Sequence, residues 1–243
     1  IPVSVFNPLS WERTDVVKLK LPEADMNEYA VFDLQGKEIG SQIVPASFLV
    51  PEKRCKRTIM FLADLVPSLG YKTFVLKKQK PAVKNVNIKI SNTEIENEFF
   101  RVAVDPDSGW IKSIFDKRNE KEILSGPGNE LQILEDIPAQ WDAWNIGLTG
   151  KKFPSNLRKI EIVETGPVRV VLRLYRDYLK PGVKKDFPTE DFPSTFFTQD
   201  IILCSGLDRI DFKTDVDWWE EHTMLKVAFP LTVNNTFASY EIP

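Results

Sequence analysis

The chain has 243 residues, of which 42% are hydrophobic and 28% charged, and its formal net charge is −3. This composition is typical of a globular protein with room for one large domain or two modest ones. Basic and acidic residues are spread along the chain. Nucleic-acid and membrane-surface partners usually require a basic patch, so we expect neither. No apolar run approaches the ~18 residues of a membrane-spanning helix.

The chain begins at Ile1 rather than at a methionine and stops on the strand-like stretch SYEIP. Its first residues do not have the pattern of a signal peptide. We therefore expect this sequence to be a piece of a longer protein, whose targeting signals would lie elsewhere.

Cysteine and histidine are rare in this chain. Cys55 and Cys204 lie far apart and have no CxxC or Cys/His neighbours, which favours two buried free thiols over a disulfide between them. His222 is the only histidine, and no GxSxG motif accompanies it, so a serine-hydrolase triad is not supported. A zinc site of the usual kind and an epimerase that uses two histidines both need more such residues, and are excluded.

Apolar residues alternate with polar ones along most of the chain, in the period of two that is typical of half-buried antiparallel strands. In chain order, this alternation predicts strands around residues 17–21, 86–90, 100–104, 170–174 and 210–218. In the last of these, one face is shared by Ile210, Phe212, Thr214, Val216 and Trp218. No stretch longer than a turn or two has helical periodicity. We therefore predict an all-β, sandwich-like fold.

Turn signals and polar stretches separate the predicted strands. The turns are DLQG at 33–36, DPDSG at 105–109 and GPGN at 126–129. The polar stretch KKQKPAVKN at 77–85 predicts a boundary between a small β-sandwich domain, residues 1–80, and a large β-domain, residues 81–243. A second proline-bearing stretch, at 178–195, predicts a long loop within the large domain.

Six tryptophans give the chain part of its heavy aromatic content. Trp11 and Trp110 each follow a turn signal, and we interpret both as packing anchors. Trp218 and Trp219 are adjacent, so on a strand their side chains point to opposite faces. We predict that Trp218 lies in the core. Trp219 shares a face with charged residues, which is either solvated or covered by a neighbouring domain.

Glu220, Glu221 and His222 follow directly. Carboxylates beside a tryptophan and a histidine are suited to acid/base chemistry, and glycosidases use two carboxyl groups that flank the bond. Two adjacent glutamates on a strand face opposite ways, however, so they cannot both flank one bond. We therefore predict a solvated acidic run here rather than a catalytic pair.

The stretch QWDAWNIG at 140–147 lies in a polar segment without strand alternation, which is typical of a loop. Trp141 and Trp144 are hard to bury on such a loop unless something covers them. Sugars stack their C–H faces on aromatic rings, while side chains such as Asp142 and Asn145 bind hydroxyls. One hypothesis is therefore a sugar subsite. The alternative is that the loop folds back and its rings cover the sheet.

An ordered set of segments along the chain resembles one known family. Most specific is NEFFRVAVDPDSGWIKSIFD at 97–116, followed by WDAW. The whole set is VFNPLSWERTDVV (5–17), ADLVPSLGYKTFVL (63–76), IENEFFRVAVDPDSGWIKSIFDKRNEKEIL (95–124), GNELQILEDIPAQWDAWNI (128–146), GPVRVVLRL (166–174) and DWWEEHTMLKVAFPL (217–231). In this order they resemble the α-mannosidases of glycoside hydrolase family 38 in their prokaryotic form. The resemblance covers essentially the whole chain and is to the C-terminal β-region of these enzymes.

The resemblance implies a small β-sandwich followed by a large supersandwich similar to galactose mutarotases, truncated at its C-terminal end. It also implies a retaining, exo-acting α-mannosidase as the parent. In such enzymes a divalent metal, typically zinc, binds the mannose 2- and 3-hydroxyls, and an aspartate is both metal ligand and nucleophile. These groups belong to an N-terminal catalytic domain and a three-helix bundle. We therefore expect no catalytic residue, metal or other cofactor in this chain.

In this family, a loop of the large β-domain reaches the rim of the active site, and ILEDIPAQWDAWN falls about there. Our hypothesis is that this loop lines the +1 side of the mannoside site or seals the interface with the catalytic domain. The residues concerned are Glu135, Asp136, Trp141, Asp142 and Trp144. The alternative is that the rings are buried within the β-domain.

The expected partners are an α-mannoside or glycan substrate and the parent's own N-terminal catalytic domain and helix bundle. Formation of a homo-oligomer stays open, and we expect a cytoplasmic location. Two other functions also stay open. One is a stand-alone carbohydrate-binding module, and the other is a scaffold that only holds the catalytic domain.

Overall fold

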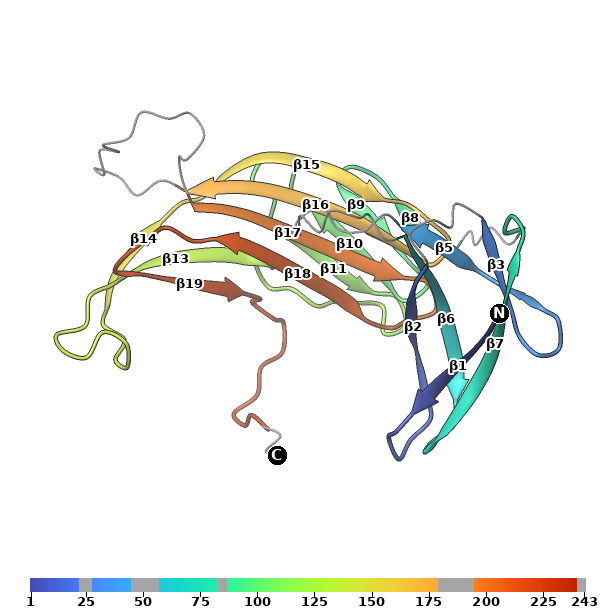
Figure 1. Ribbon diagram of the computed structural model, residues 1–243. Coiled ribbons are helices and arrows are strands. Elements are labelled where there is room, and N and C mark those ends of the chain that lie inside the picture. Colours follow the sequence, from blue (N-terminus) through green and yellow to red (C-terminus); the bar gives the residue numbers. More distant parts are fainter. Residues whose placement is uncertain (22–27, 45–56, 83–86, 179–194, 240–243) are drawn as a thin grey trace.

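The computed structural model describes residues 1–21, 28–44, 57–82, 87–178 and 195–239. These residues form nineteen strands and no helix, which confirms the predicted all-β class (Figure 1). Neighbouring strands pair in the antiparallel direction throughout the sheets. A helix that could cross a membrane is therefore also absent from the described ranges.

Two sheets of the N-terminal part pack face to face. The first has the order β1-β7-β3-β4, with β1 Pro2–Asn7, β7 Gly70–Lys78, β3 Tyr29–Phe32 and β4 Glu38–Ile39. The second has the order β2-β6-β5, with β2 Arg13–Lys20, β6 Thr58–Val66 and β5 Ser41–Val44. Fully buried side chains such as Phe61 and Phe74 fill the space between them, and Val17, Leu19 and Leu21 pack there as the alternation predicts. We call this unit the small sandwich.

Three further sheets follow. The five-stranded sheet β12-β11-β10-β9-β8 has β8 Lys89–Ile90, β9 Glu94–Glu96, β10 Phe100–Val104, β11 Ile111–Asp116 and β12 Lys121–Glu122. The four-stranded sheet has β15 Asn156–Glu164, β16 Arg169–Tyr178, β17 Thr195–Cys204 and β18 Ile210–Asp217 in that order. The three-stranded sheet β14-β13-β19 has β13 Glu130–Asp136, β14 Leu148–Phe153 and β19 Thr223–Ala228.

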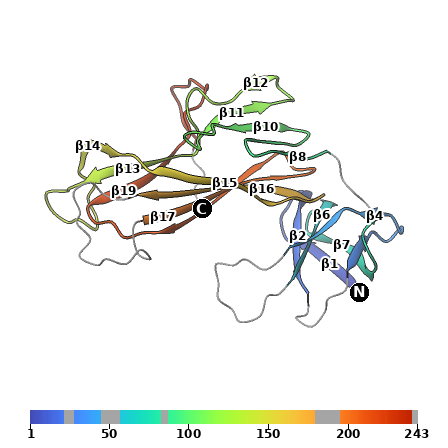
Figure 2. The same ribbon diagram turned by 90° about the horizontal axis from the view of Figure 1, so that it is seen from above.

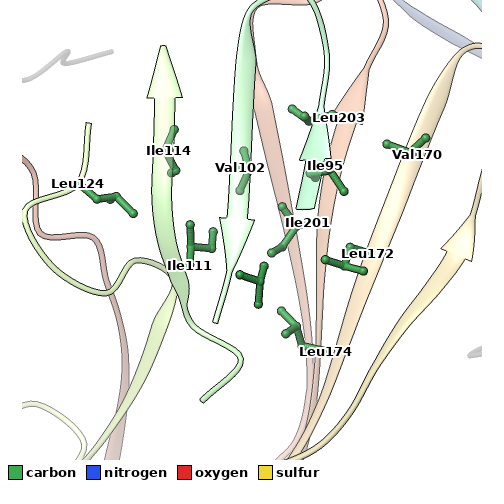
Figure 3. Close-up of a cluster of buried hydrophobic side chains, with 11 residues drawn as sticks. Ile95, Val102, Ile111, Ile114, Leu124, Val170, Leu172, Leu174, Ile201 and Leu203 are labelled. Carbon is green, nitrogen blue, oxygen red and sulfur yellow. The ribbon is translucent and has the colours of Figure 1, made fainter. Parts of the chain in front are cut away.

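The long four-stranded sheet carries two cores on one face. Toward the small sandwich it packs on the five-stranded sheet, where Leu172, Leu174 and Ile201 meet Val102 and Ile111 (Figure 3). Figure 2 shows these two sheets as separate layers. Toward its other end it packs on the three-stranded sheet, where the second core gathers Leu131, Ile133, Phe153, Tyr178 and Phe197. The two cores place the three-stranded sheet far from the small sandwich, at the opposite end of the molecule.

The aromatic predictions are partly confirmed. Trp110 and Trp218 pack against the second core, as predicted. Trp11 is not a packing anchor, because its ring is 59% exposed. Its segment is fixed through the backbone instead, since the carbonyl oxygen of Trp11 accepts a hydrogen bond from Asn7 Nδ2 at 2.7 Å. Trp219 lies on an exposed surface.

Glu220 and Glu221 do not lie on a strand, so opposite strand faces do not describe how their side chains are oriented. β18 ends at Asp217, and Glu220 and Glu221 belong to its connection with β19. The strand predicted at 210–218 thus ends one residue earlier than expected, and Glu221 and His222 are exposed, as a solvated run predicts. Glu220 turns inward and accepts a hydrogen bond from Thr195 Oγ1 at 3.3 Å.

Several predictions fall partly on residues outside the described ranges. These are Cys55, Val86 and residues 179–194 of the predicted long loop. Cys204 is a buried free thiol, as predicted. The division into domains 1–80 and 81–243 stays a prediction.

A small polar junction joins the small sandwich to the large β-region. Gln42 of β5 is 6% exposed and donates from Nε2 to Glu164 Oε1 at 2.6 Å. Its Oε1 accepts from the backbone N–H groups of Val168, at 3.2 Å, and Arg169, at 3.0 Å. Beside this amide, Val44 and Met60 pack on Val168. One side chain of the small sandwich therefore satisfies three polar groups around the β15–β16 connection.

We expect the chain to lose stability at alkaline pH. Burial, reinforced by Asp211, raises the pKa of the Cys204 thiol from 9.0 to about 11. Between these values the unfolded chain releases a proton that the folded chain keeps, so the free energy of unfolding falls as pH rises through this window, by about 3 kcal/mol at most. Denaturant unfolding at pH 8 to 11 should show this slope, and Cys204→Ala should flatten it. An equal slope in the variant would contradict the assignment.

Candidate functional site

The Trp141 segment forms the connection between β13 and β14, as the sequence predicts, and we call residues 137–147 the tryptophan loop. It projects from the three-stranded sheet at the end of the molecule remote from the small sandwich in both views (Figures 1 and 2). β13 ends at Asp136 because Pro138 cannot donate to a ladder, and β14 resumes at Leu148.

The neck of the tryptophan loop is closed by hydrogen bonds. Ile137 N–H donates to the Gly147 carbonyl at 2.8 Å, and Gly147 N–H donates to Asp136 Oδ1 at 2.6 Å. Asp136 N–H donates in turn to the His222 carbonyl at 2.9 Å, which ties the neck to the start of β19. A Cβ atom on Gly147 would lie only 2.5 Å from Pro138 Cα, so this position requires glycine. Asp136 therefore holds the loop closed.

The tip of the loop is a locally bonded turn. Trp144 N–H and Asn145 N–H both donate to the Trp141 carbonyl at 2.8 Å, and Asn145 Nδ2 donates to the Gln140 carbonyl at 2.9 Å. Trp141 has a φ of 63°, in the left-handed region that L residues seldom adopt. Such strain is concentrated at functional positions in proteins. The tip is therefore ordered by its own backbone.

Both tryptophan rings point away from the sheet. Trp141 is 71% exposed and Trp144 86% exposed, and Asp142 between them is exposed too. The alternative in which the rings are buried within this chain's β-domain is therefore wrong. Ile137 and Ile146 are also exposed and extend the apolar surface around the rings. The structure thus brings Trp141, Asp142 and Trp144 together on one tip.

Glu135 and Asp136 lie at the base of the loop rather than at its tip. They are neighbours on β13, so their side chains leave opposite faces of the strand. Glu135 accepts a hydrogen bond from Thr149 Oγ1 at 2.9 Å and pairs with Lys151 at 3.4 Å. Its carboxylate is thereby held on the same face of β13 as Ile133. The five predicted residues form two groups, a tip and a base, and their role at a substrate stays a prediction.

A buried polar group near the base was not predicted. Tyr178 is 1% exposed, and its hydroxyl has no hydrogen-bond partner among the described residues. Burial, followed by the carboxylates of Glu220 and Glu135, raises the pKa of this hydroxyl to about 12. The available signal was the alternation of Val170, Leu172 and Leu174, which continues to Tyr178 on the inner face. Near the base of the loop, the carboxylates of Glu135 and Glu220 therefore act on the hydroxyl of Tyr178, which is protonated at neutral pH.

Metal ligation finds no support among the side chains around the loop. In the ranges that the structure describes, His, Cys, Asp and Glu side chains nowhere gather in groups of three or more suited to a metal ion. The exposed His222 belongs to the β18–β19 connection and contributes its carbonyl to the loop neck. The residues present do not fit a metal, so no chemical step is assigned to one here.

Comparison with known proteins identifies the family to which this β-region belongs. Residues 95–243, more than half of the chain, match the family described as "Glycosyl hydrolases family 38 C-terminal domain". The chain therefore belongs to this family, as its sequence resemblance predicts.

Curated relatives are α-mannosidases. The chain is 24% identical over 241 residues to "Alpha-mannosidase 2C1" of Mus musculus, which covers 98% of this chain and 20% of that protein. It is 27% identical over 187 residues to the Homo sapiens protein of the same name, covering 73% of this chain and 17% of that protein. "Alpha-mannosidase G" of Dictyostelium discoideum is 30% identical over 153 residues, covering 61% and 13%. The chain thus spans a fifth or less of these relatives.

A solved structure shares the fold. The crystal structure of an α-mannosidase from Enterococcus faecalis superposes with a TM-score of 0.69 at 16% identity, covering 94% of this chain and 31% of that one. At this identity the likeness concerns the fold alone.

Proposed function

We propose that the chain is the non-catalytic C-terminal β-region of a retaining, metal-dependent exo-α-mannosidase, where its tryptophan loop lines the substrate site. The observation that carries this proposal is the pair of exposed rings, Trp141 and Trp144, on an ordered loop remote from the small sandwich. The family membership and the α-mannosidase names of the relatives support the reaction class. The catalytic domain, helix bundle and metal, which we take to be zinc, then lie outside this chain. We also retain the cytoplasmic location as a prediction.

The loop has the chemistry of a sugar platform. The C–H faces of a pyranose ring pack on exposed indoles, and the Asp142 carboxylate beside them accepts hydrogen bonds from hydroxyl groups. Because hydrogen bonds already order the neck and the tip, little further ordering is needed when a sugar binds. In this proposal the chain binds and orients the leaving-group side of a mannoside, and the bond is cleaved elsewhere.

We expect Trp141→Ala and Trp144→Ala each to raise KM for an α-mannoside about tenfold in the longer enzyme, because each removes a stacking surface. kcat should change little, and melting of the 243-residue chain should not change, since both rings are exposed. The measurement is steady-state hydrolysis of α-linked mannobioses. Gly147→Ala should raise KM as well, because it opens the neck.

Trp219→Ala provides the matched control, because Trp219 is 68% exposed but lies outside the tryptophan loop. It should leave KM unchanged. If the loop variants leave KM unchanged but lower the melting temperature of the longer enzyme, the loop seals a domain interface instead. If they change neither quantity, the loop has no part in substrate or interdomain contact.

A second function, a stand-alone carbohydrate-binding module, is favoured by the hydrogen bonds within this chain that order the neck and the tip of the tryptophan loop. Fluorescence titration of the 243-residue chain with α-mannobioses tests it, with calorimetry as a second readout. Saturable binding that Trp141→Ala abolishes would establish a binding site within this chain. An absence of binding, with changed KM in the longer enzyme, would show that the loop acts only beside the catalytic domain.

A further inference from the structure

A second group of exposed apolar side chains lies on the small sandwich, at the end where β1 leads into β2 and β6 into β7 (Figure 1). We call it the tip patch. Its members are large and between 59% and 75% exposed, and they are Phe6, Trp11, Leu65, Leu69 and Tyr71. The rings of Phe6 and Tyr71 are in contact, with centroids 5.4 Å apart. The tryptophan loop lies at the opposite end of the molecule, so the tip patch is a separate surface.

The two connections that carry the tip patch are held together by one buried side chain. Asn7 is 4% exposed and donates from Nδ2 to the carbonyl oxygens of Trp11, at 2.7 Å, and Val66, at 3.1 Å. Its Oδ1 accepts from Leu9 N–H at 3.1 Å, and Leu69 N–H donates to the Leu9 carbonyl at 2.9 Å. The patch is therefore preorganised, and ordering it costs little when a partner docks.

Two of its leucines occupy strained backbone positions. Leu65 has a φ of 48° and Leu69 a φ of 46°, both in the left-handed region that favours glycine or asparagine. Strained residues persist where the surrounding structure fixes them, and they cluster at functional surfaces. At Leu65 and Leu69 these strained positions carry large apolar side chains that are mostly exposed.

The size of the tip patch matches half of a stable interface. With about 200 Å² for each large side chain and two thirds of it exposed, the patch amounts to roughly 650 Å². The largest apolar patch of a typical monomer is about 300–600 Å². Two such patches packed together bury roughly 1,300 Å², within the range of about 1,200–2,000 Å² for specific interfaces.

The charges around the tip patch suit a second copy of the same surface. Arg13 pairs with Asp15 at 3.1 Å, and Lys72 pairs with Asp64 at 2.7 Å. Glu12 adds one further carboxylate. A rim with both signs and almost no net charge does not repel its own copy, and across a two-fold axis each cation can face a carboxylate of the other copy.

We propose that the tip patch is the self-complementary interface of a two-fold dimer of this chain. Leu69 and Trp11 of one copy pack on the patch of the other, and the rim charges exchange partners around them. This dimer is independent of the proposed sugar platform, which stays open at the far end of each copy.

Sedimentation analysis of the 243-residue chain over a wide concentration range tests the proposal. The chain should be a dimer, and Leu69→Gly should weaken its association roughly ten- to hundredfold, because it removes a buried leucine from each copy. The same change should not lower the melting temperature of the monomer, since glycine accepts the φ of 46°. Trp11→Ser should weaken association as well.

Leu34→Gly is the matched control, because Leu34 is 67% exposed in the β3–β4 connection, outside the tip patch. Association should be unchanged in this variant. A chain that is monomeric at every concentration overturns the proposal, as does a dimer that Leu69→Gly and Trp11→Ser leave intact. In a monomer, slower hydrogen exchange at the tip patch in a longer polypeptide would assign the surface to a contact within the parent protein.

Discussion

Arg176→Ala is expected to lower the free energy of unfolding by about 3–5 kcal/mol. Arg176 is 2% exposed, and its guanidinium lies 3.5 Å from the centroid of the Trp110 ring. It donates to the Ser108 carbonyl, to Ser155 Oγ at 3.0 Å and to the Ser155 carbonyl at 3.2 Å. Truncation leaves a cavity and bare carbonyl oxygens where three sheets meet.

The guanidinium carries its charge into the interior without a carboxylate among these contacts. Burial lowers the pKa of Arg176 to about 10, so the group is still protonated at neutral pH. Arg176→Met fills most of the space and removes the buried charge. It should therefore lower the free energy of unfolding by less than Arg176→Ala does, about 1–2 kcal/mol. Arg176→Lys keeps a positive charge but lacks the planar set of N–H donors of a guanidinium. Its free energy of unfolding should lie between those of the other two variants.

The measurement is denaturant unfolding followed by tryptophan fluorescence. Arg158→Ala is the matched control, because Arg158 is 60% exposed and pairs with Asp177 at the surface, a contact worth less than about 1 kcal/mol. If Arg176→Ala and Arg158→Ala lose the same free energy, the guanidinium does not hold the three sheets together.

Gly166→Ala is expected to cost about 2–4 kcal/mol by disrupting the polar junction between the small sandwich and the large β-region. A Cβ atom at residue 166 would lie 2.2 Å from Cδ and Oε1 of Gln42, far inside contact distance. The amide must leave its site, and its hydrogen bonds to Glu164, Val168 and Arg169 are then lost.

A double-mutant cycle identifies the cause. Gln42→Ala alone should cost about as much as Gly166→Ala, but adding Gly166→Ala to Gln42→Ala should cost little, because the clash is gone. Gly126→Ala is the control, since the nearest atom to its Cβ, Pro230 Cγ, lies at an ordinary 3.5 Å. Additive losses in the cycle would contradict the junction described here.

The same variants test the proposed division at residues 80 and 81. If the small sandwich and the large region are separate domains coupled by Gln42, calorimetry should change from one transition in the native chain to two in Gln42→Ala. A single transition in every variant would argue for one cooperative unit.

Much of the fold could be predicted because side chains on a half-buried strand alternate between the buried and the exposed face with a period of two residues. The faces of Val102 and Leu172 follow directly from this alternation. Trp218 was predicted correctly for the same reason. Arg176 could not be predicted, although it continues the inner face, because arginine is ordinarily exposed. Its burial depends on carbonyl groups brought by two turns distant in sequence.

The candidate site was predictable in position but not in exposure. The polar composition and the absence of strand alternation around Trp141 predicted a loop, and the structure contains one. Whether the rings face the sheet or solvent depends on the closed neck, which includes a hydrogen bond from Gly147 N–H to Asp136 that leaves no mark in hydrophobic periodicity. The prediction that Trp11 is a packing anchor was wrong for a related reason. Asn7 holds the backbone of Trp11 by a hydrogen bond and leaves its ring exposed.

The closed neck of the tryptophan loop also separates the loop's sequence from the stability of its sheet. Asp136 and Gly147 complete the last hydrogen bonds of the β13–β14 hairpin, and the rings beyond them are mostly exposed. Residues 138–146 can therefore be exchanged, lengthened or shortened as a cassette while the neck stays intact. Selection on ligand preference can act on this segment without first breaching the stability threshold of the fold.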